Sequence, residues 1–521
     1  MTSSPDYYAL LGISRSGSEE DIHLAFRALT KRLHPDVNKN LGAATQFREI
    51  NAAHDLLSNF SERQRYNAGY KPDNASLLNV RVTTSQRTLP LLDELQVLYM
   101  LVEITADPAL IVGTTEARLN LTLVLDLSKS MKEHRLERLK AATNSIIDQL
   151  DKDDILSIIT FSDDAEVLLR AEPLRDKPAA KGKIALMQPI GGTEMFKGLS
   201  KGFVENQRLA SKKYVNHIVL VTDGRTWQDE PQCLDLAERA HKEGIGISAM
   251  GMGDEWNDTF LDQLASRTGG TSEYINTSGA VVRFMNERVR SLGQSYAERL
   301  TLSVAPDPDV RLELAYRLHP TAQPVMLDQD PIPLGSLQVR GSVSVLLQFQ
   351  LNAQTRLGVR PVARLDVTGD VLREQRMGYK VIADMSVDVA EGVEPAETPL
   401  LLMDALSKFS LYRLQQRAEQ AVNAGESAQA TRHLETLATR FLQAGHTDLA
   451  SKASEEAQRV RETSHFSAEG QKALKFGTRA LGTQEARPQT AKPLALPPPS
   501  ASTPATGTPA ATRREPPKGL P

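Results

Sequence analysis

The stretch at residues 119–131 reads LNLTLVLDLSKSM and combines an apolar run with a polar end. Leucines occupy every second position as far as Leu125, and Asp126, Ser128 and Ser130 then follow with the same spacing. An apolar run of this length is typical of a buried central strand in a parallel sheet. Ligand-binding groups of open α/β sheets gather at the carboxyl ends of such strands. The sequence therefore predicts a functional loop directly after this strand.

Two further stretches carry oxygen-bearing side chains that could complete the same loop. Residues 219–224 form a second apolar run that ends in a carboxylate, and residues 191–194 form a glycine-containing loop with a hydroxyl. An aspartate and hydroxyl groups suit a hard divalent cation, which prefers oxygen ligands. We therefore predict a metal site that consists of Asp126, Ser128, Ser130, Thr193 and Asp223.

These five positions, in this order and spacing, resemble the metal-ion-dependent adhesion site of von Willebrand factor A domains. The resemblance extends to about residue 292 and implies a Rossmann-like domain that binds protein partners through Mg²⁺, with Mn²⁺ or Ca²⁺ as alternative ions. In this family an acidic side chain of the partner completes the metal coordination. Strand–helix alternation independently predicts parallel strands with right-handed crossovers. The predicted strands after the first are 154–161, 218–222 and 245–250, and the predicted helices are 135–150, 197–209 and 231–243.

The first seventy residues have the pattern of a compact helical unit. Ser18 and Asp21 form a capping-box pattern ahead of an amphipathic helix, and Pro35 ends that helix. A second amphipathic helix follows after a short gap. His34, Pro35 and Asp36 therefore occupy the tip of an exposed turn between two helices.

This helical unit resembles the J domain of DnaJ-type cochaperones over residues 6–69. The segment DYYxxLG at residues 6–12, the basic second helix and the His-Pro-Asp loop all match, whereas Asn67 stands where the family usually has aspartate. The resemblance implies a DnaK-type chaperone as partner and stimulation of its ATPase. It also implies the residues that contact this chaperone, which are His34, Pro35, Asp36, Arg27, Lys31 and Arg32.

Strand-like runs lie on both sides of the predicted α/β domain. They occupy residues 79–83 and 96–104 before it, and further runs follow between residues 299 and 389, separated by turns with proline and aspartate. Short strands with such turns predict a β-sandwich. We interpret the α/β domain as inserted in this sandwich, because the termini of a domain often lie close together. The alternative is two consecutive domains, in which the α/β domain is merely flanked by strands.

The fold class is therefore multidomain, with an all-α J domain, an α/β domain, a β-sandwich and a C-terminal helical region. Three helical patterns lie between residues 400 and 461, with Gly425 and Gly445 at helix ends. A proline-rich tail follows and is expected to be disordered. The predicted order is J domain 1–70, linker and leading sandwich strands 71–118, von Willebrand A domain 119–295, sandwich 296–395, helical region 396–482 and tail 483–521.

Composition narrows the possible functions. The net charge of −4 gives no electrostatic basis for nucleic-acid binding. Cys233 is the single cysteine, which excludes an intrachain disulfide and a zinc site of paired cysteines, and fits a reducing compartment. No apolar run reaches the roughly 18 residues that span a bilayer, and no signal-peptide core is present. We therefore expect a cytoplasmic protein without a membrane span.

The sequence favours a nonenzymatic adaptor that recruits a chaperone through one domain and a client through the other. The alternative is an assembly or regulatory subunit of an ATP-driven complex of the chelatase-like type. A metal-dependent phosphohydrolase is disfavoured, because Ser128 stands where a second carboxylate is expected. No Walker motif is present, and Gly251-x-Gly253 lacks the third glycine of a dinucleotide-binding loop. Any ATP chemistry is therefore expected to belong to the partner.

Overall fold

The computed structural model describes the chain over residues 6–69, 76–110, 116–132, 134–226, 228–275, 279–353, 356–394 and 397–483. Residues 70–75, which include most of the predicted linker, and the proline-rich tail beyond Thr483 lie outside these ranges. The described residues belong to one compact unit, which extends to Gln484.

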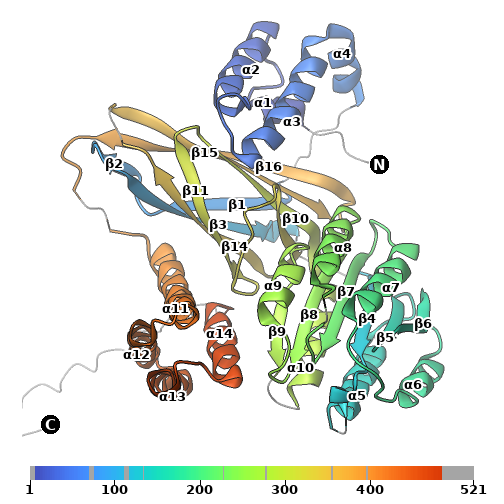
Figure 1. The fold of residues 1–521 in the computed structure, drawn as a ribbon. Helices are drawn as coiled ribbons and strands as arrows, with labels where there is room; N and C mark the ends of the chain where they lie inside the picture. Colours follow the sequence, from blue (N-terminus) through green and yellow to red (C-terminus); the bar gives the residue numbers. More distant parts are fainter. Residues whose placement is uncertain are drawn as a thin grey trace, which may run out of the picture. The chain divides into compact units, whose positions relative to one another are not determined.

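The N-terminal region contains four helices within residues 6–69 (Figure 1). The predicted capping box is present, since the Ser18 Oγ accepts from the Asp21 N–H and the Asp21 carboxylate accepts from the Ser18 N–H. Asn67, the departure from the family pattern, accepts a hydrogen bond from the Tyr8 hydroxyl at 3.2 Å. The helices are α1 Tyr7–Leu11, α2 Glu19–Leu33, α3 Leu41–Ser58 and α4 Phe60–Gly69.

The α/β domain contains a six-stranded sheet with the order β6-β5-β4-β7-β8-β9, covered by helices on both faces (Figure 1). Side chains of the central strand β4 alternate between two cores. Leu121, Leu123 and Leu125 face α5, α6 and α10, whereas Val124 faces α7, α8 and α9. The strands are β4 Leu119–Asp126, β5 Ile155–Phe161, β6 Ala165–Pro173, β7 Val215–Thr222, β8 Gly246–Met252 and β9 Ser272–Ile275. The helices are α5 His134–Gln149, α6 Lys177–Ala185, α7 Met195–Arg208, α8 Glu230–Lys242, α9 Asp258–Ser266 and α10 Ala280–Gly293.

The predicted strands β4, β5, β7 and β8 pair in parallel, which confirms the prediction, but the sheet also has an antiparallel edge that was not predicted. Strand β6 runs antiparallel to β5 and follows it after only three residues, which leaves no room for a crossover helix. The sequence patterns also missed β6, β9, α6, α9 and α10. Strand β6 lies at the sheet edge with several exposed side chains, and β9 has four residues, so neither gives a strong apolar signal.

The β-sandwich consists of two five-stranded sheets, with the orders β1-β3-β14-β11-β12 and β13-β10-β15-β16-β2. Strand β3 precedes the α/β domain and pairs antiparallel with β14, which follows it. The short strand β2 also precedes the α/β domain, and it pairs in parallel with β16, which follows that domain. Each sheet therefore contains strands that precede the α/β domain in the sequence and strands that follow it. The α/β domain is thus inserted in the sandwich. The strands are β1 Leu78–Thr84, β2 Thr88–Pro90, β3 Gln96–Ala106, β10 Ser295–Pro306, β11 Val310–His319, β12 Gln323–Pro324, β13 Ile332–Gln338, β14 Ser342–Leu351, β15 Gly358–Val371 and β16 Arg376–Ala390.

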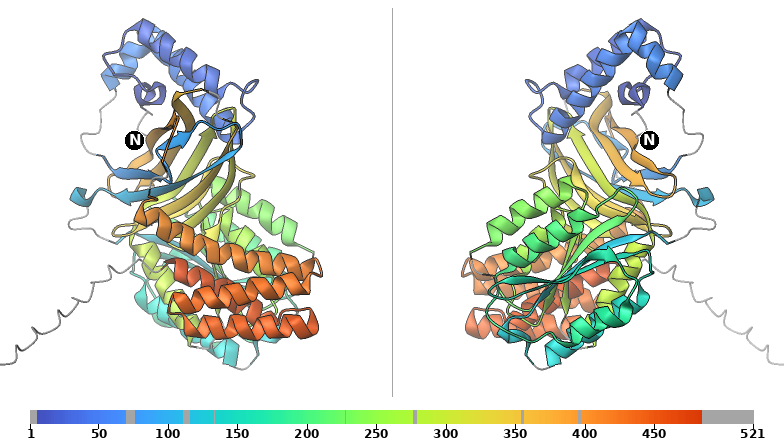
Figure 2. Two further views of the ribbon diagram at one scale, coloured as in Figure 1. Left: turned by 90° about the vertical axis from the view of Figure 1, so that its left-hand side faces the viewer. Right: turned by 90° about the vertical axis from the view of Figure 1, so that its right-hand side faces the viewer.

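The C-terminal region is a set of helices stacked side by side, coloured orange to red in Figure 2. Gly425 and Gly445 adopt φ values of 77° and 82° at the ends of the first two helices, as predicted. The fourth helix was not predicted. Among the described helices, none combines the length and apolar character that crossing a bilayer requires. The four are α11 Leu400–Asn423, α12 Ser427–Gln443, α13 Thr447–Thr463 and α14 Ala468–Thr483.

Candidate functional site

The predicted metal-binding residues meet at one edge of the six-stranded sheet. Strands β4 and β7 are parallel neighbours, with Leu125 paired to Val221, so their carboxyl ends lie side by side. Asp126 is the last residue of β4, and Asp223 directly follows β7. Both carboxylates are buried, with 0% and 1% of their residues' surface exposed.

Hydrogen bonds join four of the five predicted residues. The Ser130 hydroxyl donates to Asp223 Oδ1 at 2.6 Å and lies 2.9 Å from the Ser128 hydroxyl. The Ser128 backbone N–H donates to Asp126 Oδ1 at 2.8 Å, and the Thr222 hydroxyl donates to Asp126 Oδ2 at 2.7 Å. The two carboxylates therefore point toward the same serine loop.

Thr193 reaches this cluster on a loop between α6 and α7. That loop is tied to the serine loop, since the Ile190 N–H donates to the Leu127 carbonyl at 2.7 Å and the Lys129 N–H donates to the Gly191 carbonyl at 3.2 Å. The Thr193 hydroxyl lies 3.1 Å from where a Cβ on Gly224 would stand. The absence of a side chain at position 224 lets Thr193 lie close to the end of β7.

The electrostatics of the cluster are those of poorly solvated carboxylates. Burial raises the pKa of Asp126 to about 6, opposed by its hydrogen bonds to Thr222 and Ser128. Arg135 in the first turn of α5 forms an ion pair with Asp223, with Nη1 and Oδ2 2.6 Å apart. Arg135 could not be predicted from the sequence, because no spacing rule connects an arginine early in one helix with a carboxylate after a distant strand.

The donor set fits a hard divalent cation. It consists of two carboxylates and three hydroxyls, all oxygen groups of the kind that Mg²⁺, Mn²⁺ and Ca²⁺ prefer. The Ser128 N–H and the Thr222 hydroxyl that donate to Asp126 are neutral groups, so a bound cation would supply a positive counter-charge to this carboxylate. The described part of the chain contains no group of three His, Cys, Asp or Glu side chains placed to hold a metal ion. The assignment of a cation site here therefore depends on the hydroxyl groups of Ser128, Ser130 and Thr193 as additional ligands.

The second predicted site lies at the end of helix α2. This helix ends at Leu33, and His34 caps it, with its Nδ1 accepting from the Asp36 N–H at 3.2 Å. The His34 ring meets the ring of Phe47 edge-on, with centroids 5.0 Å apart. Pro35 and Asp36 are exposed at the tip of the loop.

The three basic residues predicted to contact the chaperone differ in their surroundings. Arg27 and Lys31 are exposed on α2. Arg32 instead pairs with two carboxylates of the sandwich, Asp307 at 2.9 Å and Asp384 at 3.0 Å. The three therefore do not form one uniformly free basic face.

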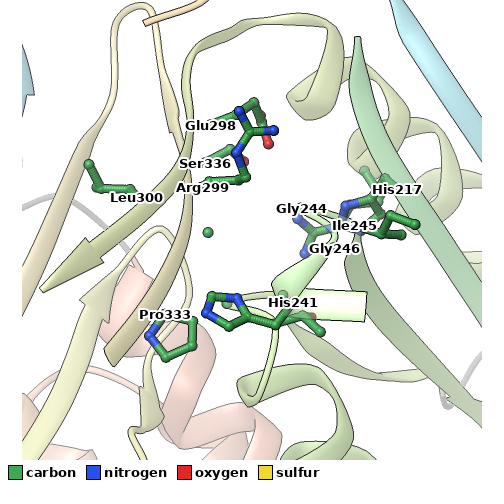
Figure 3. A pocket seen from close by; sticks show the side chains of 15 residues that line it. His217, His241, Gly244, Ile245, Gly246, Glu298, Arg299, Leu300, Pro333 and Ser336 are labelled. Carbon is green, nitrogen blue, oxygen red and sulfur yellow. The ribbon is translucent and has the colours of Figure 1, made fainter. Parts of the chain in front are cut away.

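A separate cavity of about 40 Å³ lies between the α/β domain and the sandwich (Figure 3). His217 and Gly246 line it at the amino ends of β7 and β8, so it is at the opposite sheet edge from Asp223. The buried His217 ring contacts the Ser248 hydroxyl at 2.9 Å, and burial lowers its pKa to about 3. The cavity has room for a few water molecules.

Glu298 beside this cavity predicts a pH dependence of stability. Burial raises its pKa from 4.5 to about 7, against the opposing Ser295 hydrogen bond and Arg299 charge. Since the folded value is the higher one, its contribution to stability is full below pH 4.5 and is lost as the pH rises through about 7. We expect Glu298→Gln to flatten the melting temperature between pH 5 and 8, measured by calorimetry. Glu243→Gln, at an exposed position, is the control, and an unchanged pH profile in Glu298→Gln would contradict the prediction.

Comparisons with known families match three parts of the chain. Residues 6–67 match the DnaJ domain, residues 120–287 match the von Willebrand factor type A domain, and residues 401–484 match a family described as Sll0103-like, C-terminal alpha-helical domain. The family matches agree with the resemblances inferred from the residues, and they add a family for the helical region.

Individual relatives agree with this division. The chain is 29% identical over 338 residues to the uncharacterized protein sll0103 of Synechocystis sp. The aligned region covers 61% of this chain and 78% of that protein. It is 49% identical over 61 residues to the chaperone protein DnaJ of Cyanothece sp., which covers 12% of this chain but only 16% of DnaJ. A solved von Willebrand factor type A protein from Catenulispora acidiphila is similar in fold, with a TM-score of 0.63, 16% identity, and coverage of 79% of this chain and 99% of that chain.

Proposed function

Because a J domain is fused to a von Willebrand factor A domain in this chain, we propose that it is a nonenzymatic cochaperone adaptor. The J domain recruits a DnaK-type chaperone and stimulates its ATPase, and the A domain holds the client or complex on which that chaperone acts. The observation that carries the proposal is the exposed His-Pro-Asp loop at the end of a basic helix, in a domain that matches the DnaJ family. We propose that the protein acts in the cytoplasm.

The second half of the proposal concerns the oxygen cluster at the ends of β4 and β7. When bound there, Mg²⁺ would supply a positive centre for an acidic side chain of the partner protein, and Mn²⁺ or Ca²⁺ could take its place. The buried carboxylates of Asp126 and Asp223 provide the charge, and the serine and threonine hydroxyls provide neutral ligands. The ligands proposed are Asp126, Ser128, Ser130, Thr193 and Asp223.

Substitution of His34 by glutamine tests the cochaperone assignment. The side chain is 39% exposed on a loop, so the change should leave the fold intact, while stimulation of the chaperone's ATPase is abolished. Single-turnover ATP hydrolysis by a DnaK-type chaperone is the measurement. Lys39→Gln, at an exposed position in the same loop, is the control and should stimulate like the wild type. Equal stimulation by His34→Gln and the wild type would refute the assignment.

Affinity capture with and without a chelator separates the adaptor from the alternative assembly subunit. An adaptor should retain a DnaK-type chaperone together with varied clients, and the clients should be released when the divalent cation is removed. Recovery of one stoichiometric ATPase in place of varied clients would instead favour the alternative, in which the protein is an assembly or regulatory subunit of a chelatase-like complex.

A further inference from the structure

Polar side chains of the J domain are buried by the sandwich. Asn38 is 1% exposed, and its amide donates to the Pro306 carbonyl at 2.8 Å. Gln46 on α3 is 3% exposed, and its amide donates to the Ser303 hydroxyl and to the Arg364 carbonyl, both at 3.2 Å. Burying such groups is unfavourable unless partners replace water. The sandwich supplies these partners, so the contact is specific.

Ion pairs of both polarities surround these buried groups. Arg32 of the J domain pairs with Asp307 and Asp384 of the sandwich. In the opposite sense, Glu49 of the J domain pairs with Lys380 of the sandwich at 2.7 Å. A reversed or shifted docking would place like charges together, so the pairs fix the orientation.

A glycine marks a close approach between the J domain and the sandwich. Gly42 lies in the first turn of α3, and a Cβ there would stand 1.9 Å from the Val304 carbonyl oxygen of β10. The three nearest atoms that it would meet belong to the sandwich, at Val304 and Ala305. Ala305 is in turn buried within the J-domain core, and α3 contacts β10. The lack of a side chain at position 42 therefore serves docking rather than the J domain itself.

The contact also has a weakness. Gln46 Oε1 is buried without a hydrogen-bond partner among the described residues. A buried acceptor without a partner opposes docking. Several of the other contacts are hydrogen bonds and ion pairs, whose groups can bind water when the domains separate. This composition is that of an interface that can open.

We infer that the sandwich holds the J domain in a docked state that withdraws Arg32 from the chaperone. Its guanidinium is engaged with two carboxylates, whereas Arg27 and Lys31 remain exposed. Undocking would return Arg32 to the basic face and raise stimulation of the chaperone. The effect on the chaperone rests on the proposed function, while the docking does not.

Gly42→Ala tests the inference in the full-length chain. The added methyl group collides with β10, but alanine favours the helical conformation of α3, so the J domain should stay folded. Gly69→Ala at the end of α4 is the matched control, since a Cβ there would meet nothing within 4 Å. A second variant, Asp307→Ala with Asp384→Ala, removes both acceptors of Arg32 and leaves the J-domain sequence unchanged.

The first measurement is zero-length carbodiimide crosslinking, followed by mass spectrometry. In the wild type and in Gly69→Ala we expect a Glu49–Lys380 crosslink, and in Gly42→Ala we expect its loss. The Lys181–Asp148 pair, 2.7 Å apart within the α/β domain, is the internal reference and should crosslink in every variant. A wild type without the Glu49–Lys380 crosslink, or a Gly42→Ala variant that retains it, would overturn the docking.

The second measurement is single-turnover ATP hydrolysis by a DnaK-type chaperone. Gly42→Ala and the double aspartate variant should stimulate it several-fold more than the wild type, and Gly69→Ala should not. Loss of the crosslink with unchanged or reduced stimulation would overturn the withdrawal of Arg32. If no variant stimulates, the wild type included, the proposed function fails and the crosslinks alone decide the docking.

Discussion

Replacing Asp126 by alanine is expected to abolish divalent-cation binding by the A domain. Asp126 is one of two carboxylates in the cluster. The other, Asp223, already forms an ion pair with Arg135 through Oδ2. Loss of a group that merely orients a ligand costs about 10–100-fold in metal affinity, so loss of a charged ligand should cost at least about 100-fold. Titration calorimetry with Mg²⁺ and with Mn²⁺ measures the change. Thr193→Ala removes a neutral hydroxyl and should weaken binding less.

The structure dictates the control for this experiment. Asp126 is buried and accepts hydrogen bonds from the Ser128 N–H and the Thr222 hydroxyl, so alanine leaves two buried donors without their partner. Asp126→Asn keeps an acceptor at this position but removes the charge. It should remain folded and still fail to bind the cation. Wild-type metal affinity in Asp126→Asn would contradict the assignment of Asp126 as a ligand.

Metal and partner binding should be coupled through the same residues. A partner carboxylate that completes the coordination raises metal affinity, and linkage requires the metal to raise partner affinity by the same factor. Partner affinity measured with Mg²⁺ and then with chelator should therefore differ in the wild type and not in Asp126→Asn. An equal affinity under both conditions in the wild type would separate partner binding from the metal.

Local patterns in the sequence were sufficient to predict the elements around the candidate metal site. The apolar run along β4 predicted a buried central strand, and the position of Asp126 at its end follows from the change to polar residues. Parallel pairing with β7 then brings Asp223 beside it. The same reasoning could not find Arg135 or the partners of Arg32, because Asp307 and Asp384 come from a different domain. Such ion pairs depend on how the domains pack, and the periodicity of apolar residues along the sequence contains no information on that packing.

Helix α14 shows the same limit for the fold. Its basic residues Lys472, Lys475 and Arg479 have the spacing of a solvated helix face, yet they are buried against the α/β domain. Their partners include Asp258 and Asp262 on α9, and Lys472 also lies over the Trp256 ring. Basic residues at this spacing are typical of a solvent-exposed surface, so the sequence did not indicate a buried helix here. In the structure this face joins the helical region to the A domain.

Replacing Arg479 by methionine is therefore expected to destabilise the chain strongly. Arg479 is 2% exposed and binds Asp262 in a bidentate manner, with N–O distances of 2.7 and 2.6 Å. Breaking a buried pair from one side costs about 3–5 kcal/mol, and because Lys475 still lies 2.8 Å from Asp262 we expect about 3 kcal/mol. Urea unfolding followed by circular dichroism measures the loss. Lys452→Met, which removes an exposed ion pair with Glu469, should cost under about 1 kcal/mol.

The pH dependence and a double variant identify the cause of this loss. Burial alone would raise the pKa of Asp262, but Arg479 and Lys475 hold it below its usual value of 3.8. The pair therefore stabilises the fold fully at neutral pH, and this contribution is lost as the pH falls below the usual aspartate range. Adding Asp262→Leu to Arg479→Met removes the stranded carboxylate and should recover part of the stability. If the double variant is no more stable than Arg479→Met, the loss comes from packing of the long side chain and not from an uncompensated charge.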